Sequence, residues 1–178
     1  MNPVTFGIFD TFASCIPTAG SAATTGSMPY QISNGIIGSS PEARLWDDRD
    51  IPALAGMAEA VQKHGALAGV ELTHHGPTCD CMESRETPRG PSAQPVKSFA
   101  PVQARAMDKE DIRNLRHWHK LAYRRAKRAG YDILCLYGAH GFGVIQHFLS
   151  PRTNQRTDEY GGSLENRTRF SRRIIEGI

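Results

Sequence analysis

Long apolar segments are absent from this chain of 178 residues. A membrane-spanning helix needs about 18 or more consecutive apolar residues, and no such run occurs, so the sequence predicts no membrane partner. The N-terminus also lacks the basic and apolar regions of a signal peptide, which leads us to expect a cytoplasmic protein. Hydrophobic residues make up 39% of the chain and aromatic residues 8%, enough for one core with little surplus.

Cysteine is scarce, and its spacing excludes the commonest cysteine-based architectures. A secreted disulfide scaffold would be denser in cysteine, and a zinc ribbon would show paired spacing. Two of the cysteines closely follow His74 and His75, but a second ligand pair at finger-like spacing is missing. We therefore predict no metal site, and reduced, structural or exposed thiols at Cys15, Cys79, Cys81 and Cys135.

Acidic residues are missing from the stretch 113–128, which holds nine Arg, Lys or His residues. A nucleic-acid patch is one interpretation of such a stretch. The other is the solvated face of an amphipathic helix, with cations near its C-terminal end where they favour the helix dipole. The helical periodicity of the apolar residues favours the second interpretation, so we expect no nucleic-acid partner.

What the chain does contain is an alternation of helix and strand patterns after residue 42. Residues 1–42, rich in Gly, Ser, Thr, Ala and Pro, are weakly patterned and typical of loops. Caps, apolar periodicity and buried runs predict the remaining elements. These are a helix at 51–64 capped by Asp50, a strand at 67–72, a helix from the cap Asp108 to Gly130, a strand at 131–137 and a helix at 164–178 after the cap Ser163.

The connections between helices and strands indicate which kind of α/β fold to expect. Alternating helices and strands indicate an α/β fold with a parallel sheet. The connection 73–107 and the one after residue 137 are long, whereas the helix-to-strand turns are short. A (β/α) barrel has this asymmetry because its active site is built from the loops that follow its strands.

Polar side chains lie where such an active site would form. Glu71 lies inside the first apolar strand, His74 follows the end of that strand, and Tyr137 and His140 mark the end of the next. A carboxylate inside an apolar strand is costly unless it is paired. A structural ion pair, a packed tyrosine and a capping histidine are ordinary alternatives, so residue chemistry alone leaves this site open.

Four segments resemble the Old Yellow Enzyme-like flavin oxidoreductases: 69–72, 81–92, 137–140 and 148–167. The segments Arg-Glu-Thr-Pro-Arg-Gly-Pro-Ser and Tyr-Gly-Ala-His are similar to the trimethylamine, dimethylamine and histamine dehydrogenase branch. The resemblance covers roughly residues 43–178. We expect several side chains of the last segment to lock that loop against the barrel rim: Arg152, Asn154, Arg156, Asp158 and Tyr160.

The resemblance implies FMN as cofactor and gives each candidate residue a role. Glu71 matches the residue that hydrogen-bonds the flavin pyrimidine, and Cys15 faintly matches a cysteine that bonds flavin covalently, with an ordinary thiol as the alternative. Tyr137 and His140 match residues that contact substrate and manage its proton, and His74 matches a substrate-side histidine. The implied reaction transfers hydride from a C–H next to nitrogen to flavin N5.

The resemblance also implies a partial chain. A complete barrel needs about 250 residues, so we expect residues 43–178 to form roughly the N-terminal half of a (β/α)8 TIM barrel behind the segment 1–42. The absent half would carry the phosphate site, a catalytic aspartate and, further on, any iron–sulfur cluster. We expect the isolated chain to bind FMN weakly or not at all, and activity of this chain alone is therefore in doubt.

Two other functions remain open on the sequence. One is an NAD(P)H-dependent enone or dienoyl-CoA-type flavin reductase, against which Tyr137 argues because that branch usually has histidine there. The other is a non-catalytic half-barrel fragment. In the leading interpretation the partner is a small-molecule substrate, an amine. Family members are commonly dimers, so a homodimer is a candidate assembly for the full-length parent.

Overall fold

A parallel sheet forms the centre of the structure, a computed structural model that describes residues 5–7, 22–27, 43–45, 47–78, 87–95, 103–139, 141 and 143–178. Its five described strands lie in the order β1-β8-β4-β2-β3, and all of their pairings are parallel. The strands are β1 (Thr5–Gly7), β2 (Ala22–Ser27), β3 (Ala43–Arg44), β4 (Ala68–Thr73) and β8 (Ile133–Leu136). The strands β2, β4 and β8 are therefore neighbours in space in their chain order, as in a (β/α) barrel.

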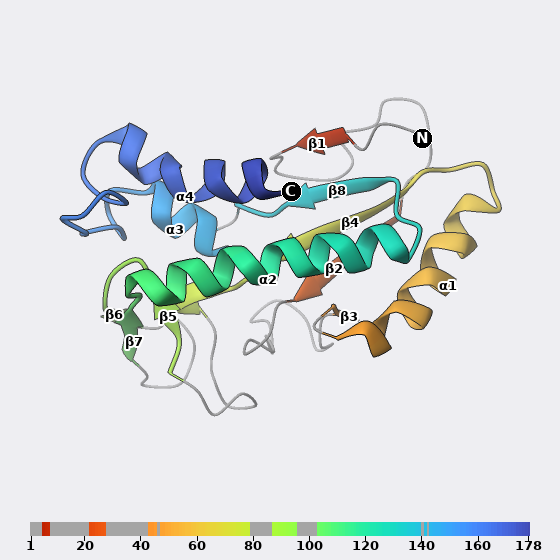
Figure 1. The fold of residues 1–178 in the computed structure, drawn as a ribbon, viewed down its shortest axis with the longest axis horizontal. Helices are drawn as coiled ribbons and strands as arrows, with labels where there is room; N and C mark the ends of the chain where they lie inside the picture. The colour runs from red at the N-terminus through yellow and green to blue at the C-terminus, as the bar shows by residue number, and fades with distance from the viewer. Residues whose placement is uncertain are drawn as a thin grey trace.

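The helices pack against the sheet and against one another (Figure 1). The long helix α2 crosses in front of the sheet, and α1 and α4 lie at its two ends. The helices are α1 (Ile51–Gln62), α2 (Lys109–Arg128), α3 (Val144–Leu149) and α4 (Leu164–Gly177), with short 3-10 turns η2 (Asp48–Asp50) and η3 (Gly76–Thr78). The three helices and two strands predicted after residue 42 are confirmed, with ends that shift by one or two residues.

The ends of α2 follow directly from its sequence. The Asp108 carboxylate accepts a hydrogen bond from the Asp111 N–H at 2.7 Å, and the Asp111 carboxylate accepts one from the Asp108 N–H at 3.0 Å. This capping box satisfies two backbone donors that the first helical turn leaves open. At the other end Gly130 has φ +88°, a conformation that favours glycine. Both predicted ends of this helix are confirmed.

The predicted cap of α1 is wrong. Asp50 occupies the N-cap position, but its side chain makes no cap hydrogen bond to α1. Its carboxylate instead accepts from the Asp47 N–H at 3.0 Å, inside the preceding 3-10 turn. The Asp47 side chain closes that turn by accepting from the Arg49 N–H at 2.9 Å. The acid therefore serves the turn before the helix, because two acids at this spacing form a capping box there.

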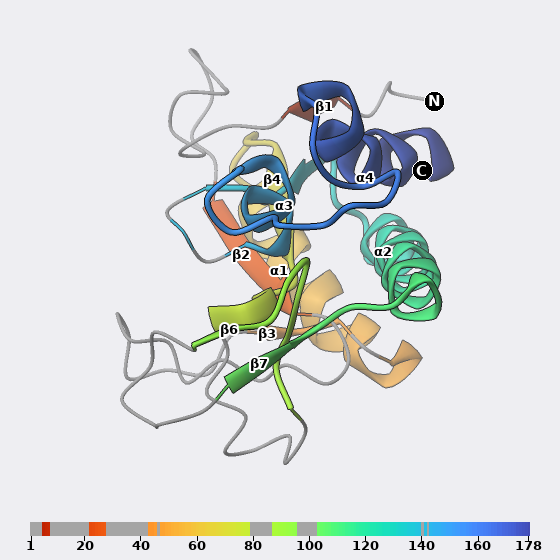
Figure 2. The same cartoon turned by 90° about the vertical axis from the view of Figure 1, so that its left-hand side faces the viewer.

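The sequence also underestimates the short strands. The expected loop at 1–42 contains β1 and β2, and β2 is paired with β4 along its whole length. The connection 73–107 contains a second small sheet of β5 (Arg89–Gly90), β7 (Gln103–Ala106) and β6 (Gln94–Pro95), which Figure 2 shows beside the main sheet. Strands of two to six small or polar residues carry little apolar periodicity, so their neighbours rather than their own pattern determine them.

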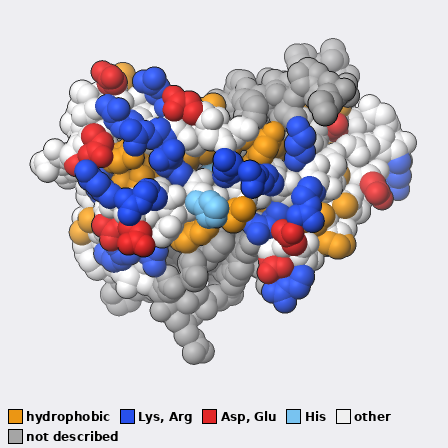
Figure 3. All heavy atoms as spheres, in the orientation of Figure 1, with side chains coloured by type: hydrophobic (Ala, Val, Ile, Leu, Met, Phe, Trp, Pro, Cys, Tyr) orange, Lys and Arg blue, Asp and Glu red, His pale blue; other side chains and the backbone are white. Residues whose placement is uncertain are grey.

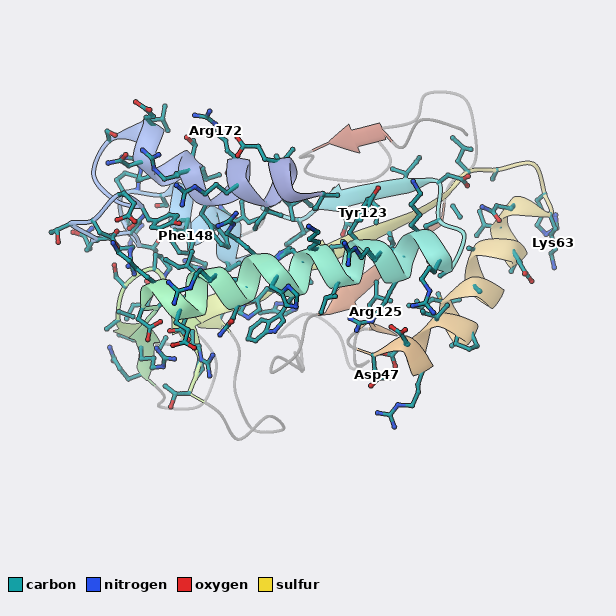
Figure 4. All side chains as sticks on the ribbon, viewed as in Figure 1. Asp47, Lys63, Tyr123, Arg125, Phe148 and Arg172 are labelled. Carbon is teal, nitrogen blue, oxygen red and sulfur yellow. The ribbon has the colours of Figure 1, made fainter. Side chains whose placement is uncertain are left out.

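Two apolar clusters connect the sheet to the helices. The first joins the outer face of β4 to α1 and α2 through residues such as Val70, Leu72, Leu54 and Ala122. The second joins α2, α3 and α4, with Phe148 and Phe170 stacked at 4.4 Å between ring centroids. Phe148 lies between α3 and α4 in Figure 4. These clusters fix the helices on the outer side of the sheet.

The basic stretch lies mostly on the exposed side of α2, opposite the buried Ile112, Leu115 and Ala122. Figure 3 shows Lys and Arg side chains interspersed with acids on this face. Arg125 and Arg128 pair with Asp48 at 2.9 and 2.6 Å, where Figure 4 shows Arg125 near the turn that carries Asp47. The stretch therefore forms the polar face of an amphipathic helix. No helix in the described part of the chain has the length and apolar character of a bilayer span.

Candidate active site

The carboxyl ends of β4 and β8 place the candidate residues side by side. Leu72 and Leu136 are paired in register, and the Tyr137 N–H donates to the Leu72 carbonyl oxygen at 3.0 Å. Because side chains alternate along a strand and Val70 and Leu72 pack outward on the helices, Glu71 and Thr73 point to the inner face. That face corresponds to the interior of a barrel.

The same alternation places residues of β8 beside those of β4. Leu134 and Leu136 belong to the outer clusters, so Cys135 and Tyr137 share the inner face. Glu71 is level with Cys135, and Thr73 is level with Tyr137. Neighbouring strands lie about 4.8 Å apart. Glu71 and Tyr137, predicted from separate strands, are therefore brought together by the sheet.

Close backbone packing holds Tyr137 in place. A Cβ added to Gly143 would lie 3.0 Å from the Tyr137 carbonyl oxygen and 3.2 Å from its ring atom Cδ1. The Val144 N–H, at the start of α3, donates to the His74 carbonyl oxygen at 2.7 Å. Gly76 has φ +62°, and a Cβ there would lie 3.0 Å from Val144. The loops after the two strands thus interlock through glycine contacts.

His74 is buried, with 3% of its surface exposed. Its Nδ1 accepts a hydrogen bond from the Gly76 N–H at 3.1 Å, and its ring stacks on Trp118 of α2 with 6.4 Å between centroids. Burial holds the pKa of His74 well below its usual range, and the nearby His119 and His75 lower it further. The structure therefore presents His74 as a neutral ring against α2, while a contact with substrate stays a prediction.

His119 is a second buried imidazole on α2. It is 1% exposed, and Nδ1 lies 2.7 Å from the Leu115 carbonyl oxygen. That oxygen can only accept, so Nδ1 carries the proton and Nε2 has the lone pair. Nε2 is buried and has no hydrogen-bond partner among the described residues. Burial lowers the pKa of His119 to about 4.

A charged side chain joins the loops that follow β4 and β8. The rim loop, residues 148–163, is tied down by Arg156, which binds Asp158 and donates to the carbonyl oxygens of Pro91 and Met107 at 3.0 and 2.5 Å. The Arg156 guanidinium lowers the pKa of the Asp158 carboxyl. One side chain therefore joins the loops that follow both strands.

Asn154 and Tyr160 complete the attachment of the rim loop. The Asn154 amide is buried and donates to the carbonyl oxygens of Phe148 and Tyr160, both at 2.7 Å. The Tyr160 hydroxyl accepts from Arg173 of α4 at 2.6 Å. The expected locking role is thus confirmed for Asn154, Arg156, Asp158 and Tyr160, whereas Arg152 is exposed.

Asp111 anchors the small sheet to the start of α2. Its carboxylate accepts from Arg105 at 2.6 and 2.8 Å and from Arg89 at 3.2 Å. Burial alone would raise the pKa of the Asp111 carboxyl, but the hydrogen bonds from Arg105 and from the Asp108 N–H hold it below its usual range. The sequence predicts no such role for Asp111, because Arg89 is 22 positions away and only the folded chain brings β5 to the start of α2.

Two predicted site residues, His140 and Cys15, lie outside the described residues, as do Cys79 and Cys81. Within the described residues, no group of three or more metal-ligating side chains occurs. Thr73 was predicted to lie in the connection after the strand, and the structure instead places it at the end of β4, on the same strand face as Glu71.

The inner face fits a flavin. Glu71 is partly exposed there and presents a carboxylate that accepts hydrogen bonds, as the N–H of a flavin pyrimidine requires. Gly69 lies on the same face and adds no side chain. The Thr73 hydroxyl is buried and has no partner in the described part of the chain, which leaves it available to a ligand. Glu71 is thus the described residue that would hold the pyrimidine ring.

Comparison with known proteins identifies this arrangement. A model of the NADH:flavin oxidoreductase / NADH oxidase family matches residues 22–178. The solved structure of histamine dehydrogenase from Rhizobium sp. 4-9 is similar, with a TM-score of 0.82 and 52% identity, and the match covers 89% of this chain and 24% of that one. The expectation of a partial (β/α)8 TIM barrel is confirmed.

Two sequence relatives are equally similar but catalyse differently named reactions. Dimethylamine dehydrogenase from Hyphomicrobium sp. (strain x) is 40% identical over 143 residues, which are 76% of this chain and 19% of the relative. NADPH dehydrogenase from Bacillus licheniformis is 40% identical over 142 residues, which are 79% of this chain and 40% of the relative. The chain thus spans less than half the length of these relatives.

Proposed function

The chain belongs to the NADH:flavin oxidoreductase / NADH oxidase family, and from this membership we propose that it is part of an FMN-dependent dehydrogenase of small amines. The observation that carries the proposal is Tyr137, at the end of β8 and level with the inner face of β4. The identity of 52% with histamine dehydrogenase supports the amine branch. Amines of the kind named in these relatives, dimethylamine and histamine, are the first substrates to test.

Each site residue has a distinct task in this proposal. When bound, FMN supplies the hydride acceptor. The Glu71 carboxylate accepts the N–H of the pyrimidine ring and orients it. The Tyr137 hydroxyl relays a proton from the ammonium form of the substrate to His140: it accepts the ammonium proton as it passes its own proton to the His140 imidazole. The amine must lose this proton because only the neutral amine has a lone pair to stabilise a developing positive charge on carbon. The packed backbone around Tyr137 keeps that hydroxyl in one position.

A second candidate function is reduction of an enone with electrons from NADPH. The 40% identity with NADPH dehydrogenase favours it. One experiment distinguishes the two candidate functions. The protein is expressed from its complete coding sequence, reconstituted with FMN under anaerobic conditions, and mixed with either an amine or NADPH. We expect dimethylamine or histamine to bleach the flavin absorbance. Bleaching by NADPH alone would contradict the amine proposal, and a stably folded protein without flavin absorbance would favour a non-catalytic fragment.

Substitution of Tyr137 tests the proton-transfer role. We expect Tyr137→Phe to lower the rate of flavin reduction by amine about a hundredfold near neutral pH. We expect the loss to shrink at high pH, where more of the amine is already neutral. The matched control Tyr123→Phe, on α2 and packed against the first apolar cluster, should reduce at the wild-type rate. An equal loss at all pH values would contradict proton transfer by Tyr137.

Substitution of Glu71 tests cofactor binding separately from the reaction. We expect Glu71→Ala to weaken FMN binding about tenfold or more, since a charged hydrogen-bond acceptor is lost. Quenching of flavin fluorescence measures this affinity without any turnover. The control Glu59→Ala removes an exposed carboxylate from α1 and should leave the affinity unchanged. Unchanged binding in the Glu71 variant would exclude the proposed contact.

A further inference from the structure

Thr73 is an unusual residue for the interior of this structure. It is 1% exposed, and its Oγ1 has no hydrogen-bond partner among the described residues. A buried hydroxyl without a partner destabilises the folded chain, because it loses its bonds to water and gains none. Valine has nearly the same shape and also favours strands, so it would fill this position without that cost.

The position of the hydroxyl suggests what it serves. Thr73 is the last residue of β4, two positions beyond Glu71, and therefore roughly 6.5 Å farther toward the carboxyl end of the sheet. It lies on the inner face at the level of Tyr137. Polar groups that point into a barrel at the ends of its strands are the ones that reach bound molecules.

The two buried imidazoles nearby, those of His74 and His119, are not hydrogen-bond partners of the Thr73 hydroxyl. The ring of His74 stacks on Trp118 of α2, and His119 belongs to the same helix. Both rings therefore lie on the helix side of the sheet, opposite to the inner face. The hydroxyl of Thr73 is thus directed away from the buried imidazoles and toward the side where Glu71 and Tyr137 lie.

We infer that Thr73 is a substrate-binding residue whose hydroxyl accepts an N–H of the amine beside Tyr137. The inference rests on the proposed function. Glu71 lies two residues earlier in β4 and is the proposed hydrogen-bond acceptor for the cofactor. Thr73 lies beside Tyr137, whose hydroxyl is the proposed proton-transfer group for the substrate. A neutral hydroxyl suits this task, since it accepts an N–H from either protonation state of the amine and adds no charge.

The test uses Thr73→Val and Thr73→Ser in the protein expressed from its complete coding sequence and loaded with FMN. Valine keeps the shape and removes the hydroxyl, while serine keeps the hydroxyl. Without amine, we expect the valine variant to melt about 2 °C higher than wild type, because an unpaired buried hydroxyl is gone. A lower melting temperature than wild type, with serine restoring it, would show a structural hydrogen bond and overturn the inference.

The second measurement is the dissociation constant of dimethylamine or histamine, taken from the concentration dependence of flavin reduction. We expect about a tenfold weaker constant in the valine variant, an unchanged maximal rate and unchanged FMN affinity, with the serine variant close to wild type. Equal amine affinity in wild type and the valine variant would overturn the inference about Thr73 and leave the proposed function standing. If amines fail to reduce the flavin of wild type, the proposed function falls, and the inference with it.

Discussion

The rim loop, residues 148–163, and the end of β4 differ in whether their buried polar atoms have hydrogen-bond partners. In the rim loop, the Asn154 amide donates two hydrogen bonds of 2.7 Å to carbonyl oxygens of the same chain. Arg156 likewise binds a carboxylate and two carbonyl oxygens. At the end of β4, Thr73 Oγ1 is buried without a partner in the described part of the chain, and His119 Nε2 on the adjacent helix α2 also has none there.

The difference separates a region whose polar atoms hold the fold together from a strand end where, as we propose above, the Thr73 hydroxyl serves a ligand. Buried polar atoms are normally hydrogen-bonded, and exceptions in a native structure require an explanation. The rim loop follows this rule closely. Proteins violate it mainly at functional sites, where stability is lower than the fold could provide. Substitutions in the two regions should therefore have different consequences.

The largest expected effect is acid destabilisation through the buried imidazoles near β4. Burial lowers the pKa of His119 from 6.5 to about 4. Between these pH values the unfolded chain binds a proton that the folded chain does not, so the free energy of unfolding decreases as pH falls from 6.5 to about 4. We expect a loss of about 3 kcal/mol from this residue, and His74 adds to it in the same direction.

Urea unfolding at several pH values measures this loss. The variant His119→Leu should remove the contribution of this residue and flatten the pH dependence. His117→Leu, exposed on the same helix, is the matched control and should show the acid loss of wild type. An unchanged pH dependence in His119→Leu would mean that the imidazole is not buried in its neutral form, and the contrast between the two regions would weaken.

The next largest effect is expected in the rim loop. Asn154→Ala leaves the carbonyl oxygens of Phe148 and Tyr160 without their donor, and each buried unsatisfied group costs about 1–3 kcal/mol. We expect the free energy of unfolding to fall by roughly 3 kcal/mol. Arg152→Ala, two residues away and exposed, should change stability little. Equal stability of the two variants in urea would show that the amide bonds do not hold the loop.

The smallest effect compares two adjacent glycines of the rim loop. A Cβ on Gly161 would lie 2.0 Å from the Arg156 carbonyl oxygen, so Gly161→Ala must displace the loop; we expect a loss of about 2 kcal/mol. Gly162 has φ +76° and open space around it, so Gly162→Ala should cost only about 1 kcal/mol of backbone strain. Thermal melting measures both. The reverse order would contradict the tight packing of Gly161 on Arg156.

Local signals explain which parts of the fold the sequence could predict. The capping residues Asp108 and Ser163 and the apolar spacing of α2 lie within a few positions of one another, so the helices were predictable. The strands β2 and β5 were not, because they depend on pairing with β4 and β7. Asp50 was correctly predicted at the N-cap position of α1, but its carboxylate accepts from the Asp47 N–H of η2 and not from α1. The turn η2 and the first turn of α1 both offer N–H donors to this carboxylate.

The candidate site shows the same division. The sequence by itself determined the identities of Glu71 and Tyr137, the strands that carry them and their resemblance to a flavin-enzyme family, because these follow from local pattern and motif. Only the tertiary structure decided that Thr73 lies on the same inner face with an unpaired hydroxyl, and that His74 lies against α2. Strand register and helix packing join residues more than 40 positions apart, and a local sequence pattern carries no information about contacts over such separations.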